Sequence, residues 1–266
     1  MIPVVIGPTG SGKTSISIEI AKAIGGEIIS ADSRTIYKGM DVGTAKPSLA
    51  EREGVVHYGF DLVELGERFT VKDWKELAEQ RIYEIRQRGK MPLVVGGTGL
   101  YVDALVFDYQ FKVRGKGYDK ERGKSIKDLY TDEKSFEQKF LEDNPDREKM
   151  CSEYKVFGIS WEREALRERL QRRAEQMFEN EELYRETERL VQKYGAESLA
   201  RLGDVYRYAW QYEQGELAKE EAINLTAIKD AQLAKRQMTW FRRNPEIMWL
   251  PLEKVYATVL KCIQDE

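Results

Sequence analysis

The stretch GPTGSGKT, at residues 7–14, decides the fold. It fits the pattern G-x-x-x-x-G-K-[ST] and lies between a short apolar run at residues 3–6 and a segment with helical periodicity. Glycines in such a turn let backbone N–H groups converge on phosphate oxygens, and the N-terminus of the following helix adds a partial positive charge. The stretch predicts a phosphate-binding loop between a strand and a helix, but it does not say which phosphorylated compound binds.

Two side chains in this loop carry the charge chemistry. Lys13 can neutralise phosphate oxygens, and the hydroxyl of Thr14 can hold Mg²⁺. The other positions contribute mainly backbone N–H groups. The residues expected to bind phosphate are Gly7, Thr9, Gly10, Ser11, Gly12, Lys13 and Thr14.

The first hundred residues alternate strand and helix patterns. A second helix is expected from residue 69 to residue 88, beginning near Thr70 with Asp73 three residues on, as in a capping box. Such alternation is typical of a parallel sheet covered by helices, so we expect an α/β fold with a P-loop NTPase-like core. The strands expected here are residues 4–6, 27–30 and 92–97, and the first helix is residues 13–24.

The second half of the chain changes character twice. Residues 108–154 are dense in charge and poor in aliphatic side chains, which predicts a small helical insertion on the surface. Residues 155–161 return to strand character, and a long charged helix is expected from Glu168 to a terminating Gly195. A helix pair and a short strand at residues 246–252 follow. The predicted core is thus residues 1–107 and 155–266, with 108–154 inserted.

Composition limits the class of protein. Apolar residues make up 41% and charged residues 33% of the 266, and no apolar run approaches the roughly 18 residues that span a bilayer. The N-terminus has no basic segment before its apolar run, and the two cysteines have no metal or redox spacing. We expect a soluble cytoplasmic protein without a membrane segment. The net charge of −3 weighs mildly against a nucleic-acid binder, although the distribution of charge matters more.

Polar residues follow two further strands of the expected sheet. Asp32 and Ser33 come directly after residues 27–30, and Thr98 lies in the glycine turn after residues 92–97. Ligands of open α/β sheets bind beyond the carboxyl ends of the strands, so these side chains should face the phosphate loop. Asp32 could hold Mg²⁺ or act as a general base, with a turn or cap role weighted equally. His57, the only histidine, is expected to be a structural hydrogen bonder.

Basic residues recur in two later segments. Arg172 and Arg173 lie on the long charged helix, where a solvated face is the simplest interpretation. KRQMTWFRR, at residues 235–243, interleaves cations with rings, a pattern that suits RNA or an amphipathic helix. We expect Trp240 and Phe241 to pack inward and some of the cations to contact RNA.

Five stretches, in this order, resemble the tRNA dimethylallyltransferases. They are GPTGSGKT, DSRTIYKGMDVGTAKP at residues 32–47, GVVHYGFDLV at 54–63, GGTGLY at 96–101 and AKRQMTWFRR at 234–243. The second is the most specific of them. The resemblance implies transfer of a dimethylallyl group from dimethylallyl diphosphate to N6 of the adenosine 3′ to the anticodon in tRNA, with release of diphosphate. The P-loop would then hold a leaving group, with no ATP consumed.

The resemblance also implies roles for individual residues. Asp32 would be the general base at N6, Thr98 its partner in the reaction channel, and Arg173 a contact to the diphosphate. Thr14 would hold the cofactor Mg²⁺, with Asp32 as a candidate second ligand. The partners would be dimethylallyl diphosphate and a tRNA anticodon stem-loop, contacted also by residues 108–154, with a monomer as the default state. The substrate- or tRNA-binding residues would be Thr9, Ser33, Arg34, Tyr37, Lys38, Asp41, Thr44, Lys46, Gly97, Gly99, Tyr101, Lys235, Arg236, Gln237 and Arg242.

Three other functions stay open. The insertion is shorter than is usual in the family, so an adenylate isopentenyltransferase acting on AMP, ADP or ATP is the first alternative. A P-loop kinase of small metabolites is the second, but it leaves residues 32–47 unexplained. A paralogue that binds RNA without catalysis is the third, and intact Lys13, Thr14, Asp32 and Thr98 argue against it.

Overall fold

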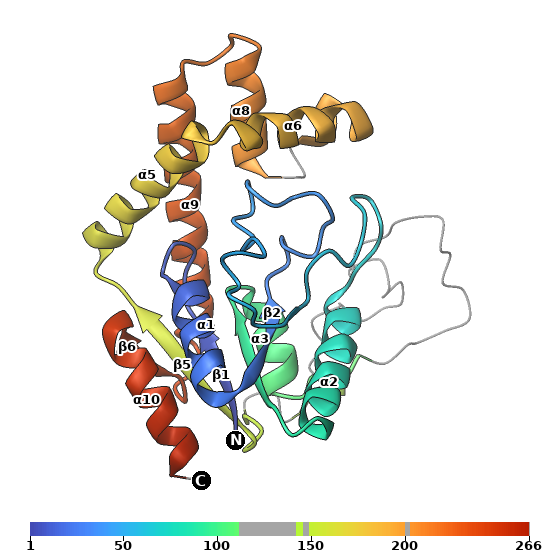
Figure 1. The fold of residues 1–266 in the computed structure, drawn as a ribbon, viewed down its shortest axis with the longest axis vertical. Coiled ribbons are helices and arrows are strands. Elements are labelled where there is room, and N and C mark those ends of the chain that lie inside the picture. Colours follow the sequence, from blue (N-terminus) through green and yellow to red (C-terminus); the bar gives the residue numbers. More distant parts are fainter. Residues whose placement is uncertain (112–141, 146–148, 200–202, 266) are drawn as a thin grey trace.

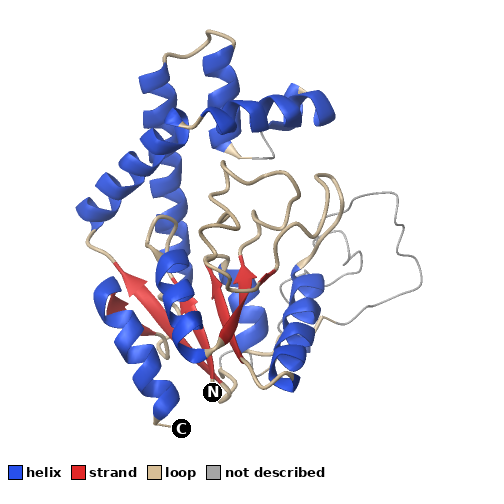
Figure 2. Ribbon diagram, in the orientation of Figure 1, coloured by secondary structure: helices blue, strands red, loops and turns tan. Residues whose placement is uncertain are grey.

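A six-stranded parallel sheet organises the protein (Figures 1 and 2). The computed structural model describes residues 1–111, 142–145, 149–199 and 203–265, so most of the insertion predicted at residues 108–154 lies outside the described residues. The strand order is β3-β2-β4-β1-β5-β6, and every pairing is parallel. The strands are β1 (Ile2–Ile6), β2 (Gly26–Ala31), β3 (His57–Tyr58), β4 (Met91–Gly96), β5 (Tyr154–Ser160) and β6 (Met248–Pro251). The predicted α/β class is confirmed.

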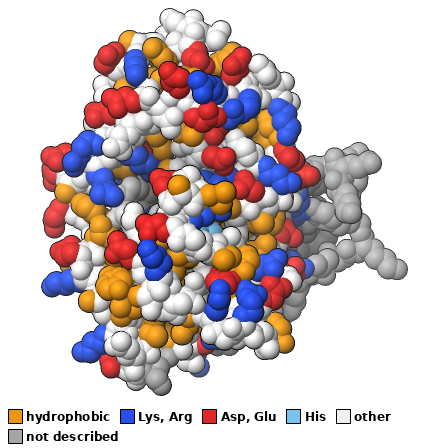
Figure 3. Space-filling view, viewed as in Figure 1, with side chains coloured by type: hydrophobic (Ala, Val, Ile, Leu, Met, Phe, Trp, Pro, Cys, Tyr) orange, Lys and Arg blue, Asp and Glu red, His pale blue; other side chains and the backbone are white. Residues whose placement is uncertain are grey.

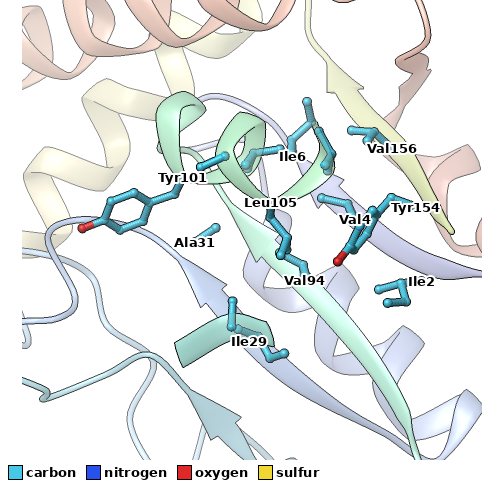
Figure 4. Packing of buried hydrophobic residues seen from close by; sticks show 14 of the residues in the cluster. Ile2, Val4, Ile6, Ile29, Ala31, Val94, Tyr101, Leu105, Tyr154 and Val156 are labelled. Atoms are coloured by element: carbon cyan, nitrogen blue, oxygen red, sulfur yellow. The ribbon is translucent and has the colours of Figure 1, made fainter. Parts of the chain in front are cut away.

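Helices cover both faces of the sheet because successive side chains of a strand point to opposite sides. On one face, Val4 and Val94 belong to a cluster that includes residues of helices α2 (Val71–Gln87) and α3 (Gly99–Val106). Figure 4 shows Leu105 of α3 among these strand side chains. On the other face, the neighbouring strand residues pack with α1 (Lys13–Ile24) and α10 (Leu252–Gln264). The result is a three-layer core whose strands are buried on both sides.

Helix α2 begins as the sequence predicts. The side chain of Thr70 accepts a hydrogen bond from the backbone N–H of Asp73, and Asp73 accepts one from the N–H of Thr70, which completes a capping box. Trp74, in the first turn, is fully buried, stacks on Tyr101 with 4.8 Å between ring centroids, and donates to the carbonyl of Ser30 at 2.9 Å. These contacts fix α2 and α3 against the end of β2.

Three loops begin at the same edge of the sheet. Gly96, the last residue of β4, is in register with Ile6 of β1 and with Ala31 of β2. A Cβ atom at Gly96 would lie 2.1 Å from the carbonyl oxygen of Ala31, so this close approach requires glycine. The phosphate loop, the Asp32 loop and the glycine turn at residues 97–98 therefore start side by side.

A layer of helices lies over this edge (Figure 1). Within it, parts of several helices share a hydrophobic cluster that is separate from the two clusters of the sheet. Residues of the β2–β3 loop, Met40 among them, belong to the same cluster. The helices are α5 (Arg163–Glu179), α6 (Glu181–Tyr194), α8 (Asp204–Glu213) and α9 (Lys219–Phe241), with a short 3₁₀ turn at Ala196–Ser198.

The single long helix expected from Glu168 to Gly195 is wrong. Asn180 has an extended backbone (φ −84°, ψ 110°) and divides the segment into α5 and α6, and its side chain accepts from the N–H of Glu182. Asparagine is a favoured N-cap, which explains the break. Gly195 does end α6, as predicted, with φ 81°. No described helix is long and apolar enough to cross a bilayer.

Candidate active site

A cavity of 260 Å³ opens where the loops at the carboxyl edge of the sheet meet the helical layer. Its walls include many of the residues that the sequence predicts for the site. Other predicted site residues lie near the cavity but do not line it. The predicted site residues that line it are Thr9, Gly10, Lys13, Thr14, Asp32, Ser33, Arg34, Thr44, Thr98, Arg173, Arg236 and Gln237.

The phosphate loop is shaped by two glycines with positive φ. Gly10 (φ 73°) and Gly12 (φ 87°) adopt a conformation that other residues rarely take. Space is also restricted, because a Cβ at Gly10 would lie 2.5 Å from Leu170. Gly12 is the N-cap of α1, so the first N–H groups of that helix are directed at the loop, as the sequence predicts.

Lys13 turns back over the loop. Its ammonium donates to the carbonyl of Pro8 at 2.8 Å. Burial lowers the pKa of Lys13 to about 8, the nearby carboxylate of Asp32 opposes that shift, and the Arg173 guanidinium adds to it. A bound anion would supply the missing negative charge and raise the pKa of Lys13 again.

Asp32 and Thr98 lie on adjoining walls of the cavity. The carboxylate of Asp32 accepts from the backbone N–H of Arg34 at 2.8 Å, which orients it at the start of its loop. The hydroxyl of Thr98 accepts from the N–H of Ser33 at 2.9 Å and contacts the Ser33 hydroxyl at 3.2 Å. The structure therefore brings together the two strand-end motifs that the sequence predicts to meet.

Arg173 reaches the phosphate loop from helix α5. Its guanidinium donates to the hydroxyl of Thr9 and lies 3.6 Å from the carboxylate of Asp230 on α9. Burial raises the pKa of Asp230, and the positive charge of Arg173 opposes that rise. Arg173 is thus placed over the cradle, whereas its neighbour Arg172 is exposed to solvent, as the surface interpretation expects.

Gln237 of α9 connects two of the loops. Its side-chain oxygen accepts from the N–H of Thr9 at 2.8 Å, and its side-chain nitrogen donates to the carbonyl of Gly97 at 2.9 Å. Three residues on, Trp240 donates to the carboxylate of Asp103 at 2.6 Å. Helix α9 therefore sets the distance between the phosphate loop and the glycine turn.

The rings of the KRQMTWFRR stretch pack inward, as predicted. Phe241 is fully buried and Trp240 is half-buried against α3. A Cβ at Gly99 would lie 2.2 Å from the Trp240 ring, so the glycine makes room for the indole. The cations Lys235 and Arg242 are exposed on the outside of the helix, away from the cavity lining.

Several predicted substrate residues have structural partners instead of a place on the cavity wall. The ammonium of Lys46 is buried and donates to the carbonyl of Tyr37 and to the carboxylates of Asp41 and Asp61, which uses its three donors. Tyr101 is buried against Trp74. The other predicted positions that lie outside the lining are Gly7, Ser11, Gly12, Tyr37, Lys38, Asp41, Gly97 and Gly99.

The sequence analysis did not predict that some of the lining residues would reach the cavity. His57 and Phe60 lie on the wall with their rings stacked, 5.6 Å between centroids. His57 Nδ1 also lies 2.9 Å from the carbonyl of Val55, which agrees with the structural role expected of it. Lys229 and Tyr206 come from α9 and α8, and no local motif marks them. Only the three-dimensional fold places these side chains at the cavity.

Charge on the visible face is mixed. Figure 3 shows basic and acidic side chains interspersed over the helical layer and the loops beneath it. Among the described residues no group of three or more His, Cys, Asp or Glu side chains is placed to hold a metal ion.

Comparison with known proteins agrees with this geometry. The family model described as IPP transferase matches residues 35–142 and 118–244, and one described as isopentenyl transferase matches residues 1–60. A protein of Acetivibrio thermocellus named tRNA dimethylallyltransferase is 37% identical over 93% of this chain and 90% of its own. One of Desulforudis audaxviator with the same name is 36% identical, over 94% and 92%.

A solved structure has the same fold. The tRNA delta(2)-isopentenylpyrophosphate transferase of Staphylococcus epidermidis superimposes with a TM-score of 0.78 at 30% sequence identity, covering 100% of this chain and 99% of that one. The resemblance that the five motifs indicate is confirmed over nearly the whole length. The chain belongs to the IPP transferase family.

Proposed function

We propose that this protein transfers the dimethylallyl group of dimethylallyl diphosphate to N6 of an adenosine 3′ to the anticodon in tRNA, acting as a cytoplasmic monomer. The relatives that match over nine-tenths of their length are named tRNA dimethylallyltransferase. The observation that carries the proposal is the cavity itself, in which a phosphate cradle faces a carboxylate and a hydroxyl. A kinase of small metabolites would need the same cradle, but it leaves the DSRTIYKGMDVGTAKP stretch at residues 32–47 unexplained.

The cradle suits a diphosphate leaving group. Lys13, the N–H groups at the start of α1 and Arg173 converge on one end of the cavity, so negative charge that develops there is stabilised. The hydroxyl of Ser17, on the cavity wall, is buried without a hydrogen-bond partner among the described residues. A phosphate bound at the cradle would therefore find these hydrogen-bond donors already in position.

In the proposed reaction, Asp32 takes the proton. The N6 nitrogen attacks C1 of the dimethylallyl group, the C1–O bond breaks, and its electron pair leaves with the diphosphate. The proton on N6 passes to the carboxylate of Asp32, whose other contact is the N–H of Arg34. Thr98 lines the same channel and is oriented by Ser33, so it can fix the adenine edge next to Asp32. The adenosine must leave its stack to enter the cavity.

Mg²⁺ fits the residues at the cradle. Thr14 and Asp32 both line the cavity, and Mg²⁺ is commonly bound by one or two protein groups together with substrate phosphates. When bound, the ion would neutralise charge on the departing diphosphate. Thr14 would hold the ion. Asp32 would either be its second protein ligand or act only as the general base at N6.

The test is transfer of labelled dimethylallyl to RNA. Purified protein, Mg²⁺ and radiolabelled dimethylallyl diphosphate are incubated with an unmodified anticodon stem-loop that carries three consecutive adenosines. We expect label on the RNA and one diphosphate released for each group transferred. Absence of label on the RNA, together with consumption of ATP in a parallel incubation, would replace the proposal with the kinase alternative.

A further inference from the structure

Glu186, in the middle of helix α6, is a buried acid in contact with a loop that is distant in the sequence. Its side chain is 1% exposed, and its two oxygens accept hydrogen bonds from consecutive backbone N–H groups of the β2–β3 loop. Oε2 accepts from Asp41 and Val42 at 3.0 Å each, and Oε1 accepts from Gly43 at 3.1 Å. Oε1 also accepts from the hydroxyl of Tyr206 at 2.6 Å.

The loop is shaped around this carboxylate. Three N–H groups that point the same way form an anion-binding concavity, and here the anion is a side chain of the protein. A Cβ at Gly43 would lie 2.4 Å from the Tyr206 ring, so only glycine lets the loop come this close to α8. Burial, and next the charge of Glu186, raise the pKa of Tyr206, which therefore stays a hydrogen-bond donor.

The same loop continues into the cavity wall. Gly43, Thr44, Ala45 and Pro47 line the cavity together with Asp32. Just before them, Met40 is buried in the hydrophobic cluster of the helical layer, and Val42 packs against that cluster. In Figure 1, α6 lies over the loops that follow β2. The position of this wall is therefore set from the helical layer and not from the sheet.

We propose that Glu186 is a positioning residue of the acceptor site, an inference that rests on the proposed function. The P-loop, Lys13 and Arg173 line the cavity where the donor phosphates would bind, and residues 43–45 and 47 line it together with Asp32. We take the wall that these loop residues form as the side on which the adenosine reaches Asp32. Glu186 fixes the backbone of that wall through residues 41–43. It touches no substrate, and it couples the helices of the upper layer to the place where the acceptor base binds.

Two variants remove the carboxylate to different degrees. Glu186→Met keeps the approximate size of the side chain but offers no oxygen to the three N–H groups. Glu186→Gln keeps one oxygen acceptor and turns an amide toward the remaining donors. For RNA we expect kcat/KM to fall about tenfold or more in Glu186→Met and less in Glu186→Gln, with a higher KM for RNA. The Kd for diphosphate should stay within about twofold of wild type.

Thr187→Val is the matched control. Thr187 is the next residue of α6, fully buried, and its hydroxyl bonds only within the helix, to the carbonyl of Leu183 at 2.7 Å. Loss of this hydroxyl perturbs the same helix without touching residues 41–43. The KM for RNA and the KM for dimethylallyl diphosphate should therefore stay at the wild-type level. Partial unfolding would lower kcat alone and leave KM for RNA unchanged. That pattern in Glu186→Met, or equal kinetics in Glu186→Met and wild type, overturns the proposal.

A second measurement does not depend on turnover. Amide hydrogen exchange at Asp41, Val42 and Gly43 should be slow in wild type and faster in Glu186→Met, with exchange in the sheet unchanged. If wild type fails to label RNA, the proposed function fails, and the exchange result still decides the structural claim. Unchanged exchange at the three amides would show that Glu186 does not hold the loop.

Discussion

The two walls of the cavity are built by different means. On the donor wall, the phosphate loop and the glycine turn extend directly from β1 and β4, and their shape follows from glycines within the loops. On the acceptor wall, residues 41–47 are far from any strand, and their shape follows from a carboxylate on α6 and from the buried Lys46. The donor wall therefore takes its shape mainly from residues within its own loops, although Gln237 and Arg173 brace it from distant helices, whereas the acceptor wall depends on a distant carboxylate for its shape.

Substitution of Asp32, between the two walls, should have the largest effect on kcat. Asp32→Asn keeps an acceptor for the N–H of Arg34 but removes the base, so kcat for transfer should fall by about 10²- to 10⁴-fold. Single-turnover transfer to the stem-loop measures this. Binding of diphosphate should be nearly unchanged, because the cradle keeps Lys13 and the helix N-terminus. Transfer within a few-fold of wild type would remove Asp32 from the role of base.

The donor wall should depend most on Lys13. Lys13→Ala removes the charge in the cradle, and diphosphate affinity measured by calorimetry should fall about 10- to 100-fold. The control is Lys22→Ala, on the same helix, where the lysine is exposed and paired with Glu53. Equal diphosphate affinities for Lys13→Ala and the control would contradict the cradle.

The link between the two glycine loops should have an intermediate effect. Gln237→Met removes both hydrogen bonds, to Thr9 and to Gly97, while keeping the length of the side chain. Leaving group and base would then lose their fixed separation, and kcat should fall about tenfold. Gln232→Met, at an exposed position of the same helix, is the control. If only the KM for RNA changed, Gln237 would be an RNA contact, as the family resemblance implies, and not a spacer.

The smallest effect is a dependence on pH. The pKa of Lys13 is about 8 in the free protein because burial disfavours its charge, and a bound anion raises it. Binding therefore takes up a proton above pH 8, so diphosphate affinity should weaken a few-fold as pH rises from about 7 to about 9. Lys13→Arg should bind with no such loss. A flat profile in wild type would mean that Lys13 is charged throughout.

Much of the donor wall could be predicted from the sequence. GPTGSGKT, the Thr70–Asp73 cap and the strand ends before Asp32 and Thr98 are local patterns, and each has the predicted place in the fold. The break at Asn180 was missed, because charged helical periodicity continues on both sides of it. An asparagine followed by two glutamates is the N-cap signal that could have revealed it.

The acceptor wall could not be predicted in the same way. Glu186 meets Asp41 across 145 positions of the chain and Val42 across 144. In sequence, Glu186 is one acid among many on a charged helix, and nothing local separates it from its solvated neighbours. Lys46 shows the converse: the family resemblance implies a substrate contact, whereas the fold buries its ammonium between two carboxylates.

In the proposed function, the cavity joins a diphosphate donor to an RNA acceptor. The most direct measurement offers labelled dimethylallyl diphosphate and Mg²⁺ side by side to the unmodified anticodon stem-loop and to AMP, ADP and ATP. We expect label on the RNA, at the adenosine 3′ to the anticodon. Label on the free nucleotides alone would keep the cradle and Asp32 but contradict the tRNA acceptor.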